Sequence, residues 1–228
     1  MKRFYKLAAI TGTGPFGIAL DDRPLRTPGR LALDLPTPAL AKAIAAEWNA
    51  QGEAIVPRSM PLTGLANAAI ERIAPERDSF AAGLAGYAET ELLAYRADYP
   101  PLLVARQRAE WDPLLAWART RYDVDFRRVT GIIHQPQPPA TLARIRAAYA
   151  AFDAFQLAAL NPIVTICGSA VIGLAVAESH LDATQAWAIG HLDELWQAEQ
   201  WGKDPLAEAG HGERQADLDA AVRLLALL

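Results

Sequence analysis

Short apolar runs in the first third of the chain alternate with polar or small residues at every second position. A period of two is the spacing of a strand with one buried face. The turn-forming pairs Asp21-Asp22 and Pro28-Gly29 separate these runs. We therefore expect a small antiparallel sheet here, built around the alternating residues Ile18, Leu20, Leu31, Leu33 and Leu35.

From Thr37 onward the apolar positions take on helical spacing. Thr37 can cap a helix whose first residue is Pro38, and apolar residues continue on one face as far as Trp48. Gln51-Gly52 ends this predicted helix. Thr63 is expected to cap the next one.

The rest of the chain is predicted to be almost entirely helical. Pro113 should kink or split one helix, and Asp182 with Gln185 forms the pattern of a capping box. Asn161-Pro162 is expected to start a helix that is apolar all round, buried at the centre of a bundle, and shorter than the roughly 20 residues of a membrane span. The predicted helices cover residues 79–93, 102–122, 140–155, 163–177, 187–202 and 205–228.

The two patterns predict a helix-dominated α+β fold. A small N-terminal antiparallel β-rich domain with its following helices would occupy residues 1–85, and a larger C-terminal helical domain residues 86–228. The boundary between them is expected to fall between Pro75 and Pro101.

Charge narrows the classes of partner. The chain of 228 residues has a net charge of −4, whereas nucleic-acid binders usually carry a basic excess, so no nucleic-acid partner is expected. Residues 1–30 hold six basic and two acidic side chains, and residues 182–219 hold nine acidic and two basic ones. This asymmetry indicates either two solvated faces or a surface that steers a charged partner.

The single cysteine, Cys167, excludes an intrachain disulfide and suits a reducing compartment. The first residues lack the apolar stretch of a secretory signal. We expect a bacterial cytoplasmic protein, or a mature form without its presequence, with no membrane insertion.

The sequence offers no recognisable catalytic set. It has no phosphate-binding loop and no nucleophile elbow, and Cys167 lies in the most apolar segment, where a thiol is usually inert. His191 and Glu194 are three residues apart, but a di-metal bundle needs further glutamates and a second such pair. No metal, cofactor or enzymatic activity is expected.

Glu194 is the most unusual polar residue. On one continuous helix it would share a face with Trp187, His191, Leu195, Ala198 and Trp201. A carboxylate among such neighbours must be paired, protonated or exposed in a groove. It could be a structural carboxylate bonded to His191 or to an arginine, a contact for a basic group of a partner, or one half of an acid–base pair with His191 in a hydrolase or lyase.

A second polar cluster contains Glu89, Glu91 and Arg96 beside Tyr87 and Tyr95. Two carboxylates could perform general acid–base chemistry. Charges at these spacings more often form local ion pairs and caps, which is the interpretation we favour.

Several segments, spread over nearly the whole chain, together match a known pattern. They are residues 23–37, 47–67, 87–96, 106–117, 168–177 and 191–202, and they include Trp48, Thr63, Asn67, Arg96, Trp111 and Trp117. In this combination the chain resembles the alpha-subunit-specific assembly chaperones of the ATP synthase catalytic head, of the mitochondrial F(1) complex assembly factor 2 type, and the resemblance suggests an alphaproteobacterial-like member. Gly64, Glu71, Glu91 and Ala94 depart from the family pattern.

The resemblance implies a protein-binding function without catalysis. Chaperones of this family bind the unassembled alpha subunit and shield the surface that later meets the beta subunit. A monomer is expected, in the cytoplasm of a bacterium and in the mitochondrial matrix for eukaryotic relatives. By resemblance, the partner-binding residues would be Asp193, Glu194, Gln197, Glu199 and Trp201.

Overall fold

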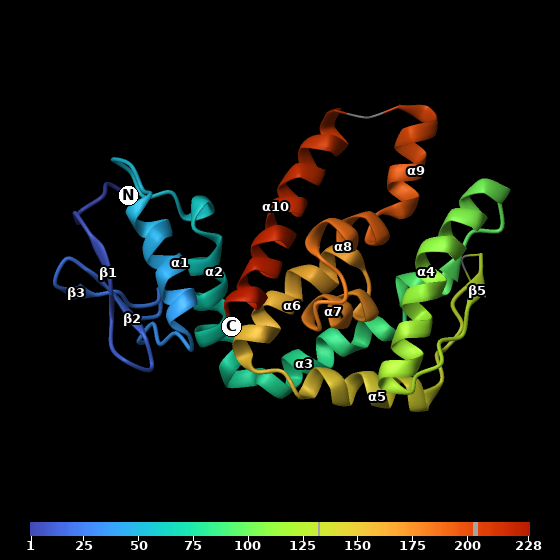
Figure 1. Cartoon of the computed structure of the whole chain (residues 1–228), viewed down its shortest axis with the longest axis horizontal. Coiled ribbons are helices and arrows are strands. Elements are labelled where there is room, and N and C mark those ends of the chain that lie inside the picture. The colour runs from blue at the N-terminus through green and yellow to red at the C-terminus, as the bar shows by residue number, and fades with distance from the viewer. Residues whose placement is uncertain (132, 203–204) are drawn as a thin grey trace. The chain divides into compact units, whose positions relative to one another are not determined.

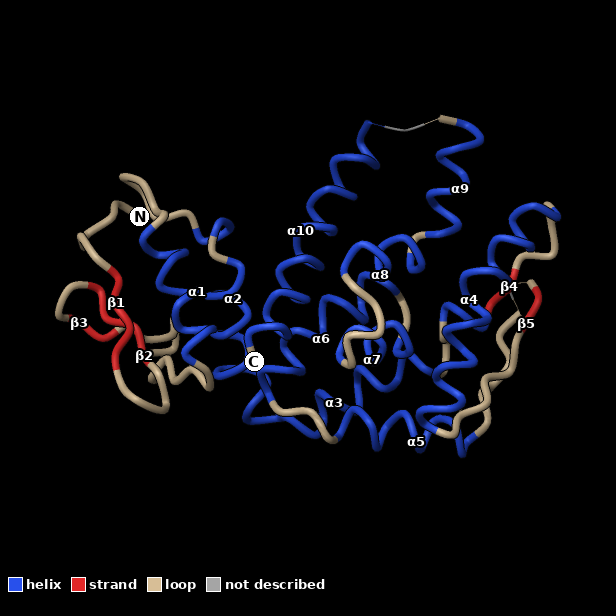
Figure 2. The backbone as a smooth tube through the Cα atoms, in the orientation of Figure 1, coloured by secondary structure: helices blue, strands red, loops and turns tan. Residues whose placement is uncertain are grey.

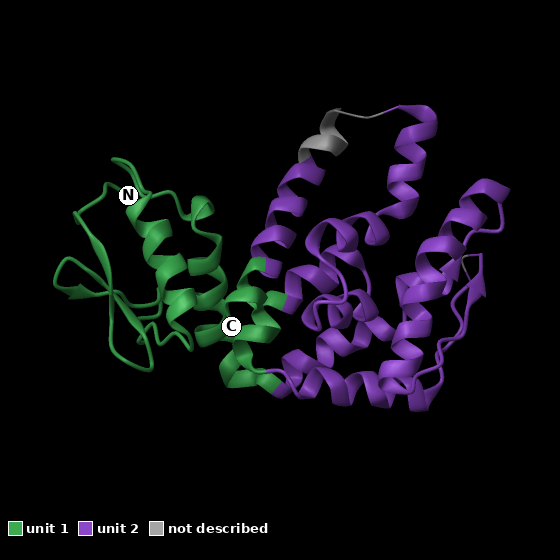
Figure 3. Ribbon diagram, in the orientation of Figure 1, with its two compact units in different colours: residues 1–77, 153–159, 223–228 green, residues 78–152, 160–222 purple. Residues whose placement is uncertain are grey.

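A computed structural model describes residues 1–131, 133–202 and 205–228, with the side chains of residues 205–209 left out. The chain forms two compact units (Figure 3). The first comprises residues 1–77, 153–159 and 223–228, and the second comprises residues 78–152 and 160–222. Each unit therefore contains segments that are far apart in the sequence.

The first unit contains the predicted antiparallel sheet (Figure 2), with strands β1 (Ala8–Thr11), β2 (Gly17–Leu20) and β3 (Arg23–Pro24) in the order β1-β2-β3. Asp21 turns the chain between β2 and β3 with a left-handed φ of 53°. Its carboxylate accepts hydrogen bonds from the N–H groups of Lys6 and Leu7 and so fastens the turn to the segment before β1.

The second predicted alternation does not form a strand. Arg26 and Ala32 make an isolated bridge, and so do Phe16 and Leu35. Leu31 is 49% exposed, whereas Leu33 and Leu35 are buried. Leu31 directly follows the turn from Thr27 to Arg30, and the left-handed φ of 67° at Arg30 interrupts the extended backbone that the alternation requires.

Helices α1 (Pro38–Asn49) and α2 (Pro61–Ala68) complete the first unit, together with the π-helical turn Ala69–Ile73. Thr37 caps α1 as predicted, because its hydroxyl accepts the N–H of Leu40. The same hydroxyl donates to the carbonyl of Leu227, at the end of the chain. Ala159 and Leu224 join the hydrophobic core of this unit.

The predicted capping role of Thr63 is wrong. Helix α2 begins at Pro61, and Thr63 lies in its first turn. Glu47 of α1 supplies the cap instead, since its carboxylate accepts the N–H groups of Leu62 at 2.8 Å and Thr63 at 2.9 Å and the Thr63 hydroxyl at 2.7 Å. A carboxylate beside the N-terminus of a helix also favours its dipole.

The second unit is almost wholly helical (Figure 1). Its only strands among the described residues are the short parallel pair β4 (Tyr95–Arg96) and β5 (Val129–Thr130). Helix α7 contacts α4 and α8, and its residues from Ala170 to Val176 are buried, as expected for an apolar central helix. The helices that lie wholly or partly in this unit are α3 (Arg77–Ala85), α4 (Pro101–Tyr122), α5 (Pro139–Ala150), α6 (Ala154–Cys167), α7 (Ala170–Ala177), α8 (Ala183–Gly190), α9 (Leu192–Trp201) and α10 (Pro205–Leu227).

Several predicted helix boundaries are wrong for identifiable reasons. Pro162 lies inside α6 rather than starting a helix. The break comes at Gly168, whose left-handed φ of 63° ends α6, and Ser169 then caps α7. The helix predicted over 140–155 ends at Ala150, and that over 79–93 ends at Ala85 and continues as short 3-10 turns. The helix predicted over 102–122 is confirmed as α4, and Pro113 lies inside it without splitting it.

No helix among the described residues is both long enough and apolar enough to cross a membrane.

Candidate functional site

The segment predicted as one helix over 187–202 is two helices. Helix α8 ends at Gly190, His191 has φ −113° and ψ 21°, and α9 begins at Leu192. The capping box of Asp182 and Gln185 starts α8 as predicted. The single continuous helix expected here is therefore wrong, although His211 contacts the rings of Trp187 and His191 and also binds Glu194.

Glu194 pairs with α10. Its carboxylate accepts a hydrogen bond from Nε2 of His211 at 2.9 Å and lies 3.9 Å from the guanidinium of Arg214. The Glu194 side chain remains 52% exposed, so this ion pair contributes little to stability but keeps the carboxylate oriented in solvent. We expected His191 or an arginine as the partner of Glu194. The histidine that binds it is His211, and the arginine is Arg214, at the longer distance of 3.9 Å.

His191 is buried and stacks on Trp187 with ring centroids 3.7 Å apart. Its Nδ1 lies 3.1 Å from the carbonyl oxygen of Trp187 and donates to it, which leaves Nε2 as the unprotonated nitrogen. Burial, the main cause, lowers the pKa of His191 and favours the neutral ring. Within the described part of the chain, no hydrogen bond joins His191 to Glu194, so the acid–base pair of the hydrolase or lyase hypothesis is not assembled.

Asp193 and Glu199 face α4. Nε2 of Gln107 donates to Oδ1 of Asp193 at 2.8 Å, and Arg106 binds Glu199 at 2.7 Å. The hydrogen bond from Arg106 is the main reason that the pKa of Glu199 is lowered. Part of the acidic excess in the last third of the chain is therefore neutralised within the second unit.

Glu194, Gln197 and Trp201 of α9 are exposed, and we call the face that carries them the outer side of α9. Trp201 is 75% exposed and packs edge-on against Trp196, with centroids 5.8 Å apart. Positions 194, 197 and 201 are three and four residues apart and so share one face of the helix. An exposed indole beside a carboxylate and an amide is a combination typical of protein-binding surfaces.

The other residues of the matching segments support the fold. Trp48 and Trp111 are buried, and Trp117 stacks on His180 with centroids 4.8 Å apart. Thr63 binds Glu47, and Asn67 is half-buried in α2.

Glu89, Glu91 and Arg96 form ion pairs and a cap, but the ion pairs join residues distant in the sequence and are not the local ones that we expected. Glu89 lies 3.4 Å from His134, and Arg96 lies 2.8 Å from Asp112. Glu91 is fully buried, and its carboxylate accepts the hydroxyl of Ser169 and the N–H groups of Val171 and Leu93. It therefore closes the N-terminus of α7, next to the break at Gly168.

Ionisation of Glu91 should make the protein less stable as the pH rises. Burial, the main cause, raises the Glu91 pKa from 4.5 to about 7 against the opposing hydrogen bonds. The folded state thus holds this proton more tightly than the unfolded state, and the resulting stabilisation, complete below pH 4.5, is lost as the pH rises through about 7. We expect a loss on the order of 2–3 kcal/mol between about pH 5 and pH 8, measured by denaturant unfolding. Glu91→Gln should lack this component, and a variant profile that still parallels the wild-type one would contradict the assignment.

Cys167 is buried, and burial raises the pKa of its thiol to about 12. Its Sγ lies 3.6 Å from the carbonyl of Ala186, and a Cβ on Gly190 would come within 2.9 Å of the Cys167 side chain. The thiol therefore packs between α6 and α8 and is not placed to act as a nucleophile. Among the described residues, no group of three or more histidine, cysteine, aspartate or glutamate side chains could hold a metal ion.

Four residues that sequence reasoning missed help to build this region. His211 and Arg214 come from α10, and Arg106 and Gln107 come from α4. Each lies between 17 and 93 residues from its partner in the sequence, so no local spacing could have revealed the contact.

Comparison with known proteins places the chain in a family. A sequence model of the family described as ATP12 chaperone protein matches residues 2–119, more than half of the chain. The protein named "Protein atp12, mitochondrial" from Schizosaccharomyces pombe is 27% identical over 214 residues, which cover 88% of this chain and 74% of that protein.

Solved structures share the fold over almost the whole chain. The crystal structure of Atp12 from Paracoccus denitrificans is 46% identical, covers 99% of this chain and 97% of its own, and has a TM-score of 0.95. The Atu1473 protein from Agrobacterium tumefaciens is 39% identical, with coverages of 99% and 85% and a TM-score of 0.94. These matches in sequence and in structure agree, and the chain belongs to the ATP12 chaperone protein family.

Proposed function

We propose that this chaperone binds the unassembled alpha subunit of the ATP synthase catalytic head and covers its subunit interface until assembly. Membership of the ATP12 chaperone family is the observation that carries the proposal. Isolated subunits of a ring expose apolar interfaces that aggregate unless they are covered, so a dedicated binding protein has a clear physical role.

The outer side of α9 is the proposed contact with this client. Glu194 offers an oriented carboxylate to a basic group, and Trp201 offers a large apolar surface. Gln197 lies between them, and Asp193 and Glu199 hold the helix on α4 while keeping polar atoms near the contact. We propose that the protein acts as a monomer in the bacterial cytoplasm, without catalysis and without a cofactor.

A binding experiment with the cognate alpha subunit tests this function. The tagged chaperone should retain purified, soluble alpha subunit that is free of the beta subunit, and added beta subunit should displace the chaperone. Failure to bind under conditions where the alpha subunit stays soluble would overturn the proposal.

Glu194→Gln should weaken client binding without unfolding the protein. The amide oxygen can still accept the hydrogen bond from His211, whereas the charge is lost. We expect the Kd to rise about 5- to 20-fold, as for a charged contact of intermediate burial. Titration calorimetry measures the Kd, and a thermal melt checks the fold.

Glu76→Gln is the matched control, since Glu76 is an exposed carboxylate of the first unit, far from α9 in the sequence. Its Kd should stay within about two-fold of the wild type, as for most surface substitutions. Equal Kd values for wild type and Glu194→Gln would remove Glu194 from the contact.

A further inference from the structure

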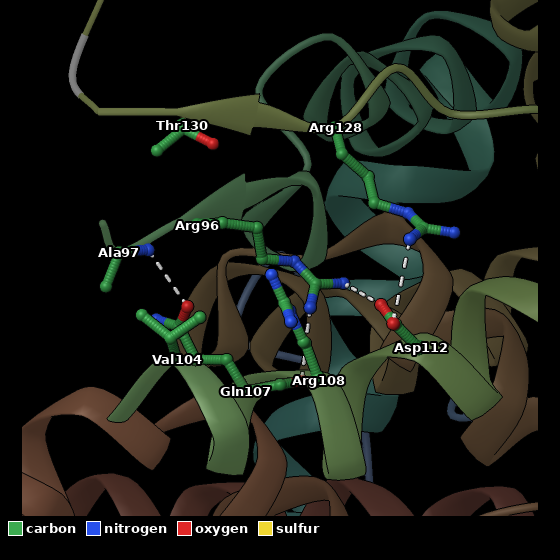
Figure 4. A pocket seen from close by; sticks show the side chains of 8 residues that line it. All are labelled: Arg96, Ala97, Val104, Gln107, Arg108, Asp112, Arg128 and Thr130. Atoms are coloured by element: carbon green, nitrogen blue, oxygen red, sulfur yellow. Dashed lines mark hydrogen bonds and ion pairs between the residues drawn. The ribbon is translucent and has the colours of Figure 1, made fainter. Parts of the chain in front are cut away.

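A small cavity in the second unit is lined by three arginines and one carboxylate (Figure 4). Its volume is about 160 Å³, and it lies between α4 and the strand pair β4–β5. A cavity of this volume has space for the end of one side chain, because a single water molecule occupies about 30 Å³ in the liquid. The lining residues are Arg96, Ala97, Val104, Gln107, Arg108, Asp112, Arg128 and Thr130.

All three nitrogens of Arg96 lie close to acceptors of the protein itself. Its Nε donates to the carbonyl of Leu93 at 2.9 Å, one terminal nitrogen donates to the carbonyl of Gln107 at 3.2 Å, and the other lies 2.8 Å from Oδ1 of Asp112. Its side chain is 9% exposed. Arg96 therefore forms the floor of the cavity, and its charge is matched by Asp112.

Arg108 and Arg128 leave positive charge unmatched. Arg128 makes only a long ion pair of 3.6 Å with the second oxygen of Asp112, and its side chain is 60% exposed. Among the residues that the structure describes, Arg108 has no hydrogen bond or ion pair. Burial is the main cause that lowers the pKa of Arg96, and the like charges of Arg128 and Arg108 act in the same direction. The cavity thus holds three guanidinium groups but one carboxylate, which pairs with only two of them, and a bound anion would relieve the repulsion between the like charges.

The donors in the cavity suit a carboxylate. The N–H of Ala97 is already donated to Oε1 of Gln107, and the lining residues of α4 lie within the helix, where their N–H groups are bonded internally. Ala97 and the lining residues of α4 therefore offer none of the free backbone N–H groups on which many phosphate sites are built. Planar guanidinium groups bind carboxylates through paired hydrogen bonds.

A part-buried hydrogen bond connects the cavity wall to α9. Gln107, which forms one wall, donates to Asp193 of α9 at 2.8 Å, and Asp193 is the neighbour of Glu194.

We propose that Arg108 and Arg128 bind the carboxylate of an acidic side chain of the client protein. This inference rests on the proposed function for the identity of the client. The chemistry of the cavity can be tested without it.

The first experiment uses a minimal probe and observes the arginine Nε–H signals of the whole protein by NMR. An acetylated and amidated Gly-Glu-Gly peptide should shift the Arg108 and Arg128 signals saturably, whereas Gly-Gln-Gly should not. Inorganic phosphate at matched ionic strength should bind more weakly than the glutamate peptide. No saturable shift with the glutamate peptide, or tighter binding of phosphate, would overturn the carboxylate assignment.

The second experiment measures binding of the alpha subunit. The double variant Arg108→Ala/Arg128→Ala should bind at least about 10-fold more weakly than the wild type, as expected when charge-assisted hydrogen bonds are lost. Arg108→Lys/Arg128→Lys keeps the charge but not the paired geometry, so its affinity should lie between the two. Arg146→Ala, which removes an exposed arginine of α5 outside the cavity, should match the wild type.

The two experiments separate the possible failures. If the wild type does not bind the alpha subunit, the proposed function fails, and the peptide titration still decides the chemistry of the cavity. If the wild type binds and the folded double variant binds equally well, the cavity does not contact this client and the inference is overturned.

Discussion

Glu91→Ala is expected to lower the free energy of unfolding by roughly 3–5 kcal/mol. The Glu91 side chain is fully buried, and its carboxyl group holds three donors: the Ser169 hydroxyl and the N–H groups of Val171 and Leu93. Alanine would leave these donors without their acceptor and would leave a cavity beside α7. Denaturant unfolding at about pH 6 measures the change.

Glu91→Gln provides an intermediate case. Its single amide oxygen can replace only part of the acceptor capacity, so we expect about half of the alanine effect. Glu89→Ala is the matched control, because the Glu89 side chain is 36% exposed and pairs with His134 at the surface. It should cost less than about 0.5 kcal/mol. Equal losses for Glu89→Ala and Glu91→Ala would mean that the buried cap is not what stabilises this region.

Trp111→Ala should destabilise the protein by about 3–5 kcal/mol. Trp111 is 1% exposed, its Nε1 donates to the carbonyl of Ile189 at 3.0 Å, and the Arg96 guanidinium lies 5.2 Å from its ring centroid. The substitution would open a large cavity and leave the Ile189 carbonyl without this donor. Trp111→Phe should lose less, since it keeps most of the apolar volume.

Trp201→Ala tests whether burial causes the Trp111 effect. Trp201 is the same residue type but is 75% exposed, so its removal should change the free energy of unfolding by no more than about 0.5 kcal/mol. A loss at Trp201 as large as that at Trp111 would show that α9 is a structural element of the second unit, and would weaken its assignment as a client surface.

Elements specified by neighbouring residues could be predicted from the sequence. The cap of Thr37 before Pro38 and the capping box of Asp182 and Gln185 each span three residues, and both are present. The antiparallel sheet was predictable in the same way, because a period of two and a turn at Asp21 are local signals.

Features that depend on distant residues could not be predicted. The N-terminus of α2 is capped by Glu47, which lies on the preceding helix, and the prediction that Thr63 caps α2 was therefore wrong. Pro162 lies inside α6, because burial of this helix outweighs the local cost of proline. The position of Glu194 depends on His211 of α10, and the partner-binding role predicted for α9 stays a prediction.

The return of residues 223–228 to the first unit constrains the order in which the protein can fold during synthesis. The core of that unit needs Ala159 and Leu224, and the carbonyl of Leu227 accepts the hydroxyl of Thr37, which lies 190 residues earlier. When the first 77 residues leave the ribosome, their core still lacks these two apolar side chains. The first unit therefore cannot reach its final packing before residues 223–228 have been translated, long after residues 1–77.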